Sequence, residues 1–317
     1  MSDIAILGAT SHIARGLLYN FCRTGRYELF LFARSPESVK QFLSGIECHR
    51  DVHVQQLQEF NNGKYDVVIN CIGIGNVAKL KNREREIFLL TEMADALVLD
   101  YLNVHPETLC VNFSSGAVYG KEFHAPADDA TTAVLEVNHI LPNDYYRIAK
   151  INSEAKHRAF QHLNIVDLRV FAYFSRFLDL ESHFFIAEAL SCIKMKKIFV
   201  TGSQNMVRDY IHPKDLLSLI EKCIERRRLN DVFDALSLRP VTKFEILDFF
   251  ATAFGLKYRV DDTVGIYNVT GNKEMYYSAG TRAQEIGYVP LFSSMDSIVD
   301  ESSAILRTAS FFRGMHA

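Results

Sequence analysis

Tyr146 and Lys150 lie four residues apart in a predicted helix, so both side chains share one helical face. A phenol has a pKa of about 10, and a neighbouring ammonium favours the phenolate and lowers that pKa. Tyr146 could therefore act as an acid or a base near neutral pH. Ser115 ends an earlier predicted strand, where its hydroxyl could hold the carbonyl or alkoxide oxygen of a substrate. Together the three residues predict a catalytic site for proton transfer.

A turn that begins with a glycine near the N-terminus predicts a nucleotide site. The segment GATSHIARG at residues 8–16 follows a predicted strand and opens a predicted helix. That position directs backbone N–H groups and the positive end of the helix dipole at a phosphate. Ser11 and Ala14 stand where dinucleotide-binding turns carry glycines, so an ordinary strand–helix turn stays open as the alternative. We expect cofactor contacts from Gly8, Thr10, Ser11, His12 and Ile13.

The end of the second predicted strand bears on the choice of cofactor. An acidic residue there would bind the adenosine ribose hydroxyls, whereas an arginine suits a 2′-phosphate. Positions 30–36 hold no Asp or Glu but do hold Arg34 and Ser35. We therefore predict that these two residues bind NADP(H). NAD(H) stays possible, with Arg34 then an ordinary surface arginine.

Two further motifs complete a set that spans nearly the whole chain. Residues 112–120 read NFSSGAVYG, and residues 208–216 read RDYIHPKDL. With GATSHIA, YRIAK and LRVFAYF, they make the sequence similar to the extended short-chain dehydrogenase/reductases of the NAD(P)-dependent epimerase/dehydratase family. Those enzymes act on nucleotide sugars, which are therefore the expected substrate class.

The resemblance implies roles for individual residues. Ser115, Tyr146 and Lys150 match the catalytic residues of the family, and Lys150 is also expected to orient the nicotinamide ribose. The family often forms dimers by pairing two helices from each subunit. Here these helices would be residues 84–102 and 143–163, so we expect a homodimer.

The resemblance also suggests how the substrate is bound. Arg208 matches an arginine that binds the nucleotide diphosphate, a role that suits its planar charged fork. An ion pair of Arg208 with Asp209 or Asp215 is the structural alternative. Tyr119 is expected to shape the sugar pocket, and Ser115 to contact the sugar. The asparagine that commonly contacts the diphosphate in this family is replaced by alanine at position 172.

Several reactions fit these residues. The prediction is NADPH-dependent reduction of a 4-keto nucleotide sugar, which Arg34 favours through the cofactor. The alternative is an epimerase that oxidises and re-reduces the sugar on a retained NAD(P). A 4,6-dehydratase is disfavoured, because such enzymes carry Thr-Asp-Glu near the position of Ser115. A non-catalytic NADP-binding regulator is the alternative from another class, and the retained Ser115, Tyr146 and Lys150 argue against it.

Apolar runs and helical stretches alternate through the first two thirds of the chain. Continuous apolarity indicates strands buried on both faces, and strands separated by helices predict a doubly wound parallel sheet. Strands are expected at residues 4–7, 28–33, 52–54, 66–72, 108–113, 165–171, 197–201 and 231–235. Helices are expected at residues 13–23, 84–102, 143–163, 186–195, 213–227, 242–254 and 293–308.

The pattern changes after about residue 172, where short aromatic and charged segments begin. We predict an α/β fold: a Rossmann-type, doubly wound parallel sheet with a smaller interleaved α/β substrate-binding lobe. The NAD(P)-binding Rossmann domain comprises residues 1–171 with 213–236, and the substrate-binding lobe residues 172–212 with 237–317.

Composition excludes several other classes. The 317 residues are 48% hydrophobic and 23% charged with a net charge of −3, which gives no electrostatic basis for binding nucleic acid or an anionic membrane. No apolar run approaches the roughly 20 residues of a membrane span. The first residues lack a signal-like segment, so we expect a cytoplasmic protein. The histidines and the six cysteines show no metal-binding spacing, so no metal is expected.

Overall fold

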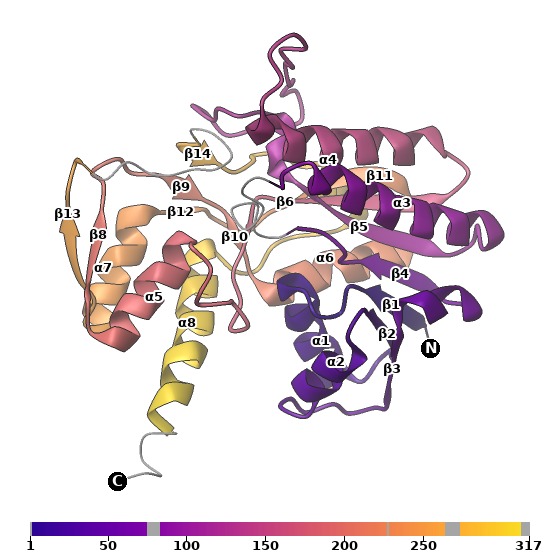
Figure 1. Cartoon of the computed structure of the whole chain (residues 1–317), viewed down its shortest axis with the longest axis horizontal. Helices are drawn as coiled ribbons and strands as arrows, with labels where there is room; N and C mark the ends of the chain where they lie inside the picture. The colour runs from indigo at the N-terminus through magenta and orange to yellow at the C-terminus, as the bar shows by residue number, and fades with distance from the viewer. Residues whose placement is uncertain (1, 75–82, 227, 264–272, 312–317) are drawn as a thin grey trace.

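A computed structural model describes residues 2–74, 83–226, 228–263 and 273–311. Its centre is a seven-stranded parallel sheet with the order β11-β6-β5-β4-β1-β2-β3 (Figure 1). Strand order reverses between β1 and β4, so a crevice for ligands opens at the carboxyl ends of these strands. The predicted fold class is confirmed. The strands are β1 (Asp3–Leu7), β2 (Glu28–Ala33), β3 (Val52–Gln56), β4 (Val67–Asn70), β5 (Leu109–Ser115), β6 (Asn164–Val170) and β11 (Asn230–Ala235).

Helices cover both faces of this sheet (Figure 1). On one face lie α1 (His12–Thr24), α2 (Pro36–Leu43) and α6 (Pro213–Arg226), and on the other α3 (Glu86–Val104) and α4 (Pro142–Ala159). Ile4 and Ile6 of β1 pack into the first layer, while Ala5 and Leu7 pack into the second. Successive side chains of a strand point to opposite faces, so burial on both faces explains the continuous apolarity of the strands.

A smaller α/β lobe lies beside the sheet (Figure 1). Its own hydrophobic cluster includes Phe174, Leu190, Leu247 and Phe250. The chain enters this lobe after β6, returns to the sheet for α6 and β11, and then leaves again, so the lobe is interleaved. The lobe's helices are α5 (Phe185–Met195), α7 (Lys243–Phe254) and α8 (Ser294–Phe311); its strands pair as β7 (Ala172–Tyr173) with β10 (Tyr210–Ile211), β8 (Ile198–Thr201) with β13 (Lys257–Val260), and β9 (Val207–Arg208) with both β12 (Val241–Thr242) and β14 (Met275–Tyr276).

Most element ends agree with the sequence prediction within a few residues, but α4 does not. The predicted helix at 143–163 is too long, since α4 ends at Ala159. The side-chain amide of Asn230 in β11 donates to the carbonyl oxygens of His157, Phe160 and Leu163, at 3.1, 3.0 and 3.0 Å. A side chain distant in sequence therefore holds the turn that follows α4. In the predicted helix at 213–227, Arg227 lies outside the described residues.

Candidate active site

Ser115 is the last residue of β5, and its side chain is buried. Its Oγ lies 3.2 Å from the phenol oxygen of Tyr276 in β14 and accepts a 3.2 Å hydrogen bond from the backbone N–H of Ala117. Burial raises the pKa of Tyr276 well above its ordinary value, although the hydrogen bond with Ser115 opposes this. Either hydroxyl can be the donor in this contact. When the phenol of Tyr276 donates, the hydroxyl proton of Ser115 is left to donate to a substrate oxygen.

Lys150 and Tyr146 of α4 lie at the same end of β5. The Lys150 ammonium donates a 2.7 Å hydrogen bond to the carbonyl oxygen of Phe113, two residues before Ser115. It also lies 5.9 Å from the centre of the Tyr146 ring. Tyr146 is half-buried and lines a small cavity with Ala117 and Gly120. Both of these residues follow closely on Ser115, the last residue of β5. The structure thus brings the three predicted catalytic residues together, and their roles stay predictions. The other residues that line the cavity are Lys121, Asn143, Arg147 and Lys273.

A buried charged cluster joins α4 to the sheet. Glu154 of α4 accepts a 2.5 Å hydrogen bond from the hydroxyl of Ser114 in β5. The Arg169 guanidinium of β6 binds both oxygens of the same carboxylate, its closest contact being 2.6 Å. The Arg169 and Glu154 side chains are only 20% and 9% exposed. Hydrogen bonds of this kind are directional, so they fix the position of α4 along and around its axis.

A second polar row crosses the sheet beneath α4. Asn70 donates to Asn112, and Asn112 donates to Asp167, so three neighbouring strands are linked by their side chains. His157 of α4 lies within 2.9 Å of the same Asp167 carboxylate. Burial alone would raise the pKa of Asp167, but its hydrogen bonds with His157 and Asn112 lower that pKa below its ordinary value. The ionised carboxylate is therefore an anchor for α4.

The turn after β1 has the geometry of a dinucleotide site. Gly8 has a φ of 71°, and a Cβ there would lie 2.9 Å from the backbone of Cys71. Only glycine fits this position. The hydroxyl of Ser11 accepts from the N–H of Ala14 and caps α1. The backbone N–H groups of His12 and Ile13 have no acceptor among the described residues, and they fit a phosphate.

The other predicted cofactor residues differ in solvent exposure. Thr10, Arg34 and Ser35 are exposed, the last two where β2 ends and α2 begins. The His12 ring instead points inward, with Nε2 2.8 Å from the hydroxyl of Ser175. Burial lowers the pKa of His12 to about 4, so this ring is neutral at physiological pH. His12 can therefore offer a phosphate its backbone N–H but not a positive charge.

Arg208 is buried in β9 and held by backbone carbonyl groups. Its Nη1 donates to the carbonyl oxygens of Val207 and Lys273 at 2.8 and 2.6 Å. The guanidinium carbon lies 5.8 Å from the centre of the Tyr276 ring. Burial lowers the pKa of Arg208 from its ordinary value. Arg208 therefore lies next to the ring of Tyr276, and the hydroxyl of Tyr276 contacts Ser115.

The structural alternative for Arg208, an ion pair with a nearby aspartate, is wrong. Asp209 accepts from the backbone N–H of Ser237 at 3.0 Å, and Asp215 from that of Phe292 at 2.9 Å. Neither carboxylate forms an ion pair with Arg208 within the described parts of the chain. Both aspartates instead secure backbone segments that enter the lobe.

Tyr119 lies apart from the cavity beside Tyr146. Its hydroxyl donates to Asp234 at 2.9 Å and accepts from Arg169 at 2.8 Å. It lines a different cavity, of about 80 Å³, with Asp129 and Gly280 among its other residues. The structure therefore does not bring Tyr119 together with the predicted catalytic residues.

Sequence reasoning missed Tyr276 and Lys273. Neither belongs to a motif, and no periodic pattern surrounds them. They reach the site because β14 pairs with β9 in the lobe. In the part of the chain that the structure describes, no helix is long and apolar enough to cross a bilayer, and no cluster of His, Cys, Asp and Glu could hold a metal ion.

The sequence model of the NAD dependent epimerase/dehydratase family matches residues 4–235. Apart from Asp3, the first residue of β1, that range contains the seven strands of the large sheet, as well as Ser115, Tyr146 and Lys150. The chain belongs to this family. The resemblance inferred from the motifs is thereby confirmed, while no curated protein sequence matches the chain.

Solved structures of family members share the fold over almost the whole length. A UDP-glucose-4-epimerase from Stenotrophomonas maltophila, with bound NAD and formylated UDP-arabinopyranose, is 14% identical with a TM-score of 0.80, over 98% of this chain and 99% of that chain. The UDP-glucose 4-epimerase of Bifidobacterium longum, in complex with NAD+ and UDP, is 17% identical with a TM-score of 0.78, over 98% and 99%. A dTDP-glucose 4,6-dehydratase from Bacillus anthracis, with NAD, is 15% identical with a TM-score of 0.73, over 98% of each chain.

The contacts of α4 predict a large effect of Glu154→Gln. The substitution keeps the shape of the side chain but removes the charge that Arg169 binds, so the free energy of unfolding should fall by about 3 kcal/mol. The matched control is Glu92→Gln, since Glu92 of α3 also binds α4, through Lys156, but is 52% exposed. It should cost at most about 1 kcal/mol. Urea denaturation measures both, and equal losses would mean that the buried pair does not anchor α4.

Proposed function

We propose that this chain is a nucleotide-sugar epimerase that oxidises and re-reduces one carbon of the sugar. The observation that carries the proposal is the arrangement at the end of β5. There Tyr146 and Lys150 of α4 lie near Ser115, whose hydroxyl also contacts the phenol of Tyr276. Two of the structural relatives described above are UDP-glucose 4-epimerases, which supports epimerisation over simple reduction.

The chemistry that this site must perform is the interconversion of an alcohol and a carbonyl. NAD(P), when bound, would supply the hydride chemistry of this interconversion. Tyr146 would take the proton from the sugar hydroxyl and later return it. Ser115 donates a hydrogen bond to the same oxygen and so holds it close to the phenol.

The N-termini of α1 and α2 would hold the cofactor. The N–H groups of His12 and Ile13 would bind the pyrophosphate, and Gly8 gives the turn its required shape, with Thr10 and Ser11 beside it. Lys150 would contact the nicotinamide ribose, as the family resemblance implies.

Arg208 would bind the substrate diphosphate. Among the described residues, only its Nη1 has acceptors, so Nε and Nη2 are left for phosphate oxygens. Tyr119 would shape the sugar site only through the elements that it joins. A cytoplasmic location and the division into a Rossmann domain and a substrate-binding lobe stay predictions.

A reductase of 4-keto nucleotide sugars is the second candidate, and Arg34 favours it. Arg34 is exposed at the end of β2, and no described residue pairs with it, so it is available to a 2′-phosphate. NADPH that binds and leaves suits a reductase, whereas an epimerase retains its cofactor. The absorbance spectrum of the purified protein separates the two, because a retained cofactor remains bound during purification.

Tyr146→Phe tests the catalytic assignment. It removes one oxygen and little volume, so folding and cofactor binding should survive. Positioned proton transfer contributes about 10²–10⁴ in rate, and the loss should fall on kcat. Turnover of UDP-glucose, and of a 4-keto sugar with NADPH, measures it. Turnover at the parental rate would contradict the assignment, and a parent that binds NADPH but turns over neither would favour the regulator.

Arg34→Ala tests the cofactor choice. If Arg34 binds the 2′-phosphate, the variant should bind NADPH about tenfold more weakly and NADH as before. Fluorescence titration of both cofactors against both proteins measures this. Arg23→Ala is the matched control, because Arg23 is an exposed arginine at the far end of α1. An equal loss for NADPH and NADH would contradict the NADP assignment.

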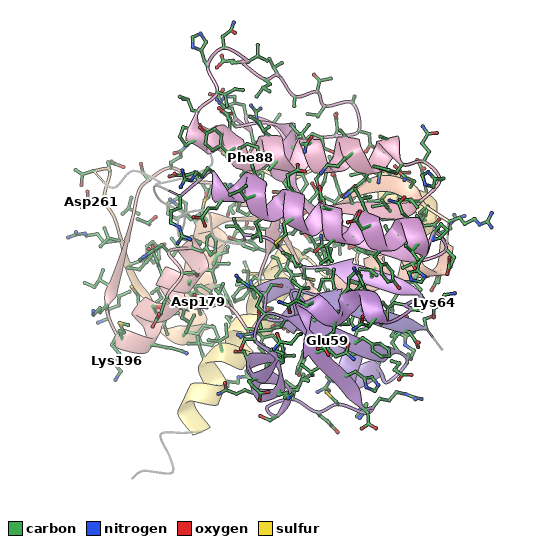
Figure 2. The ribbon with its side chains drawn as sticks, turned by 45° about the vertical axis from the view of Figure 1, so that its right-hand side comes forward. Glu59, Lys64, Phe88, Asp179, Lys196 and Asp261 are labelled. Atoms are coloured by element: carbon green, nitrogen blue, oxygen red, sulfur yellow. The ribbon has the colours of Figure 1, made fainter. Side chains whose placement is uncertain are left out.

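We also propose a homodimer through α3 and α4, which lie side by side (Figure 1). Leu89 and Met93 of α3 are 68% and 49% exposed and one helical turn apart. Phe88, labelled in Figure 2, contacts Tyr145 of α4 with ring centres 5.4 Å apart, so the two helices form one surface.

Leu89→Glu tests the dimer. A charge in the interface between the paired helices would be buried without a partner, so the variant should sediment as a monomer while the parent sediments as a dimer. Leu291→Glu changes an equally exposed leucine outside these helices and should leave the dimer intact. A Leu89→Glu variant that stays dimeric would place the interface elsewhere.

A further inference from the structure

Lys273 is a buried lysine without an acidic partner. The residue is only 5% exposed, and its ammonium lies 4.1 Å from the centre of the Tyr276 ring and 5.8 Å from that of Phe123. No described carboxylate forms an ion pair with it. The residues outside the described ranges include no Asp or Glu, so they hold no acidic side chain either. Aromatic faces attract a cation, but they do not replace a counterion.

The cavity that Lys273 lines has an excess of positive charge. Lys121 and Arg147 line it as well. Both bind the same carboxylate, that of Asp144, at 2.9 Å each. These two cations share one carboxylate, and Lys273 has none among the described residues, so the cavity has an excess of positive charge that an anionic ligand could balance.

The energetics of Lys273 agree with a missing anion. Burial, then the charges of Arg208 and Arg147, lower the pKa of Lys273 to about 7. Near neutral pH the side chain is therefore protonated only in part. An anion beside it would restore the ammonium, since an opposite charge favours the charged form.

The position of Lys273 bears on which part of the substrate would carry the anion. Lys273 shares its cavity with Tyr146, and it contacts Tyr276, the partner of Ser115. These residues surround the reacting carbon in the proposed function. Arg208, the expected diphosphate contact, is not among the residues that line this cavity. An anion bound in this cavity would therefore lie beside the reacting sugar.

We propose that Lys273 binds a carboxylate of the sugar, so that the substrate is a nucleotide-linked hexuronic acid. This inference rests on the proposed function and names its substrate class. Lys273 would be a specificity residue, since it distinguishes a carboxylate from the hydroxymethyl group of a neutral hexose.

The test compares UDP-glucuronic acid with UDP-glucose, which differ in that group alone. Calorimetric titration of the parent should show at least tenfold tighter binding of UDP-glucuronic acid. Lys273→Met should remove this preference and leave UDP-glucose binding unchanged, while Lys273→Arg should retain the preference. Lys214→Met is the matched control, since Lys214 also lies over an aromatic ring, that of Phe292, but on the exposed surface.

Binding should also depend on pH. Only the ammonium form attracts the carboxylate, so affinity for UDP-glucuronic acid should be greatest below the pKa of free Lys273 and fall as the pH rises above about 7. Affinity for UDP-glucose should stay constant in the same range. In the Lys273→Met variant both profiles should be flat. Among the described residues, the other charged or titratable groups around Lys273 are Lys121, Tyr146, Arg147, Arg208 and Tyr276. Asp144 binds Lys121 and Arg147.

Three outcomes would overturn the proposal. The parent could bind the two sugars equally; Lys273→Met could weaken both equally, which would place Lys273 on the shared nucleotide diphosphate; or it could keep the preference. A melting curve shows that each variant is folded, and loss of an unpaired buried charge should not lower the melting temperature. Failure of the epimerase proposal is seen separately, in the turnover of the Tyr146→Phe variant.

Discussion

Helix α4 carries both Tyr146 and Lys150, and buried polar contacts determine where it lies on the sheet. Glu154 and His157, further along the helix, bind side chains of β5 and β6. Apolar packing holds a helix against a sheet but has little directional preference, whereas hydrogen bonds and ion pairs do. These contacts therefore set the rotation of α4 about its own axis. That rotation decides whether the phenol and the ammonium reach the end of β5, where Ser115 lies.

Two buried cations near this helix show opposite ways of meeting the cost of desolvation. Arg169 has its counterion within the protein, because Glu154 binds it with two oxygens. Lys273 has no such partner in the part of the chain that the structure describes, and burial, with the charges of Arg208 and Arg147, lowers its pKa. A paired cation contributes to the architecture, while an unpaired one gains most when a ligand brings the negative charge.

The site is assembled from segments that are far apart in the chain. Ser115 ends a strand of the large sheet, Tyr146 comes from the following helix, and Tyr276 comes from β14 of the lobe. Strand β14 reaches the site because it pairs with β9, the strand that contains Arg208. The chain leaves the sheet to form the lobe, and the lobe supplies Tyr276 to the site. The Rossmann-like part of the chain has no such side chain at this position.

Sequence alone determined the strands of the sheet, the turn at Gly8 and the motif residues at the end of β5, because each of these depends on neighbours close in the chain. Continuous apolarity, a strand–helix junction and the spacing of Tyr146 and Lys150 are local patterns. Only the tertiary structure decided where α4 ends, which groups hold Arg208, and that Lys273 lies buried beside Tyr276. Burial and charge pairing depend on segments brought together by folding, and no local pattern records them.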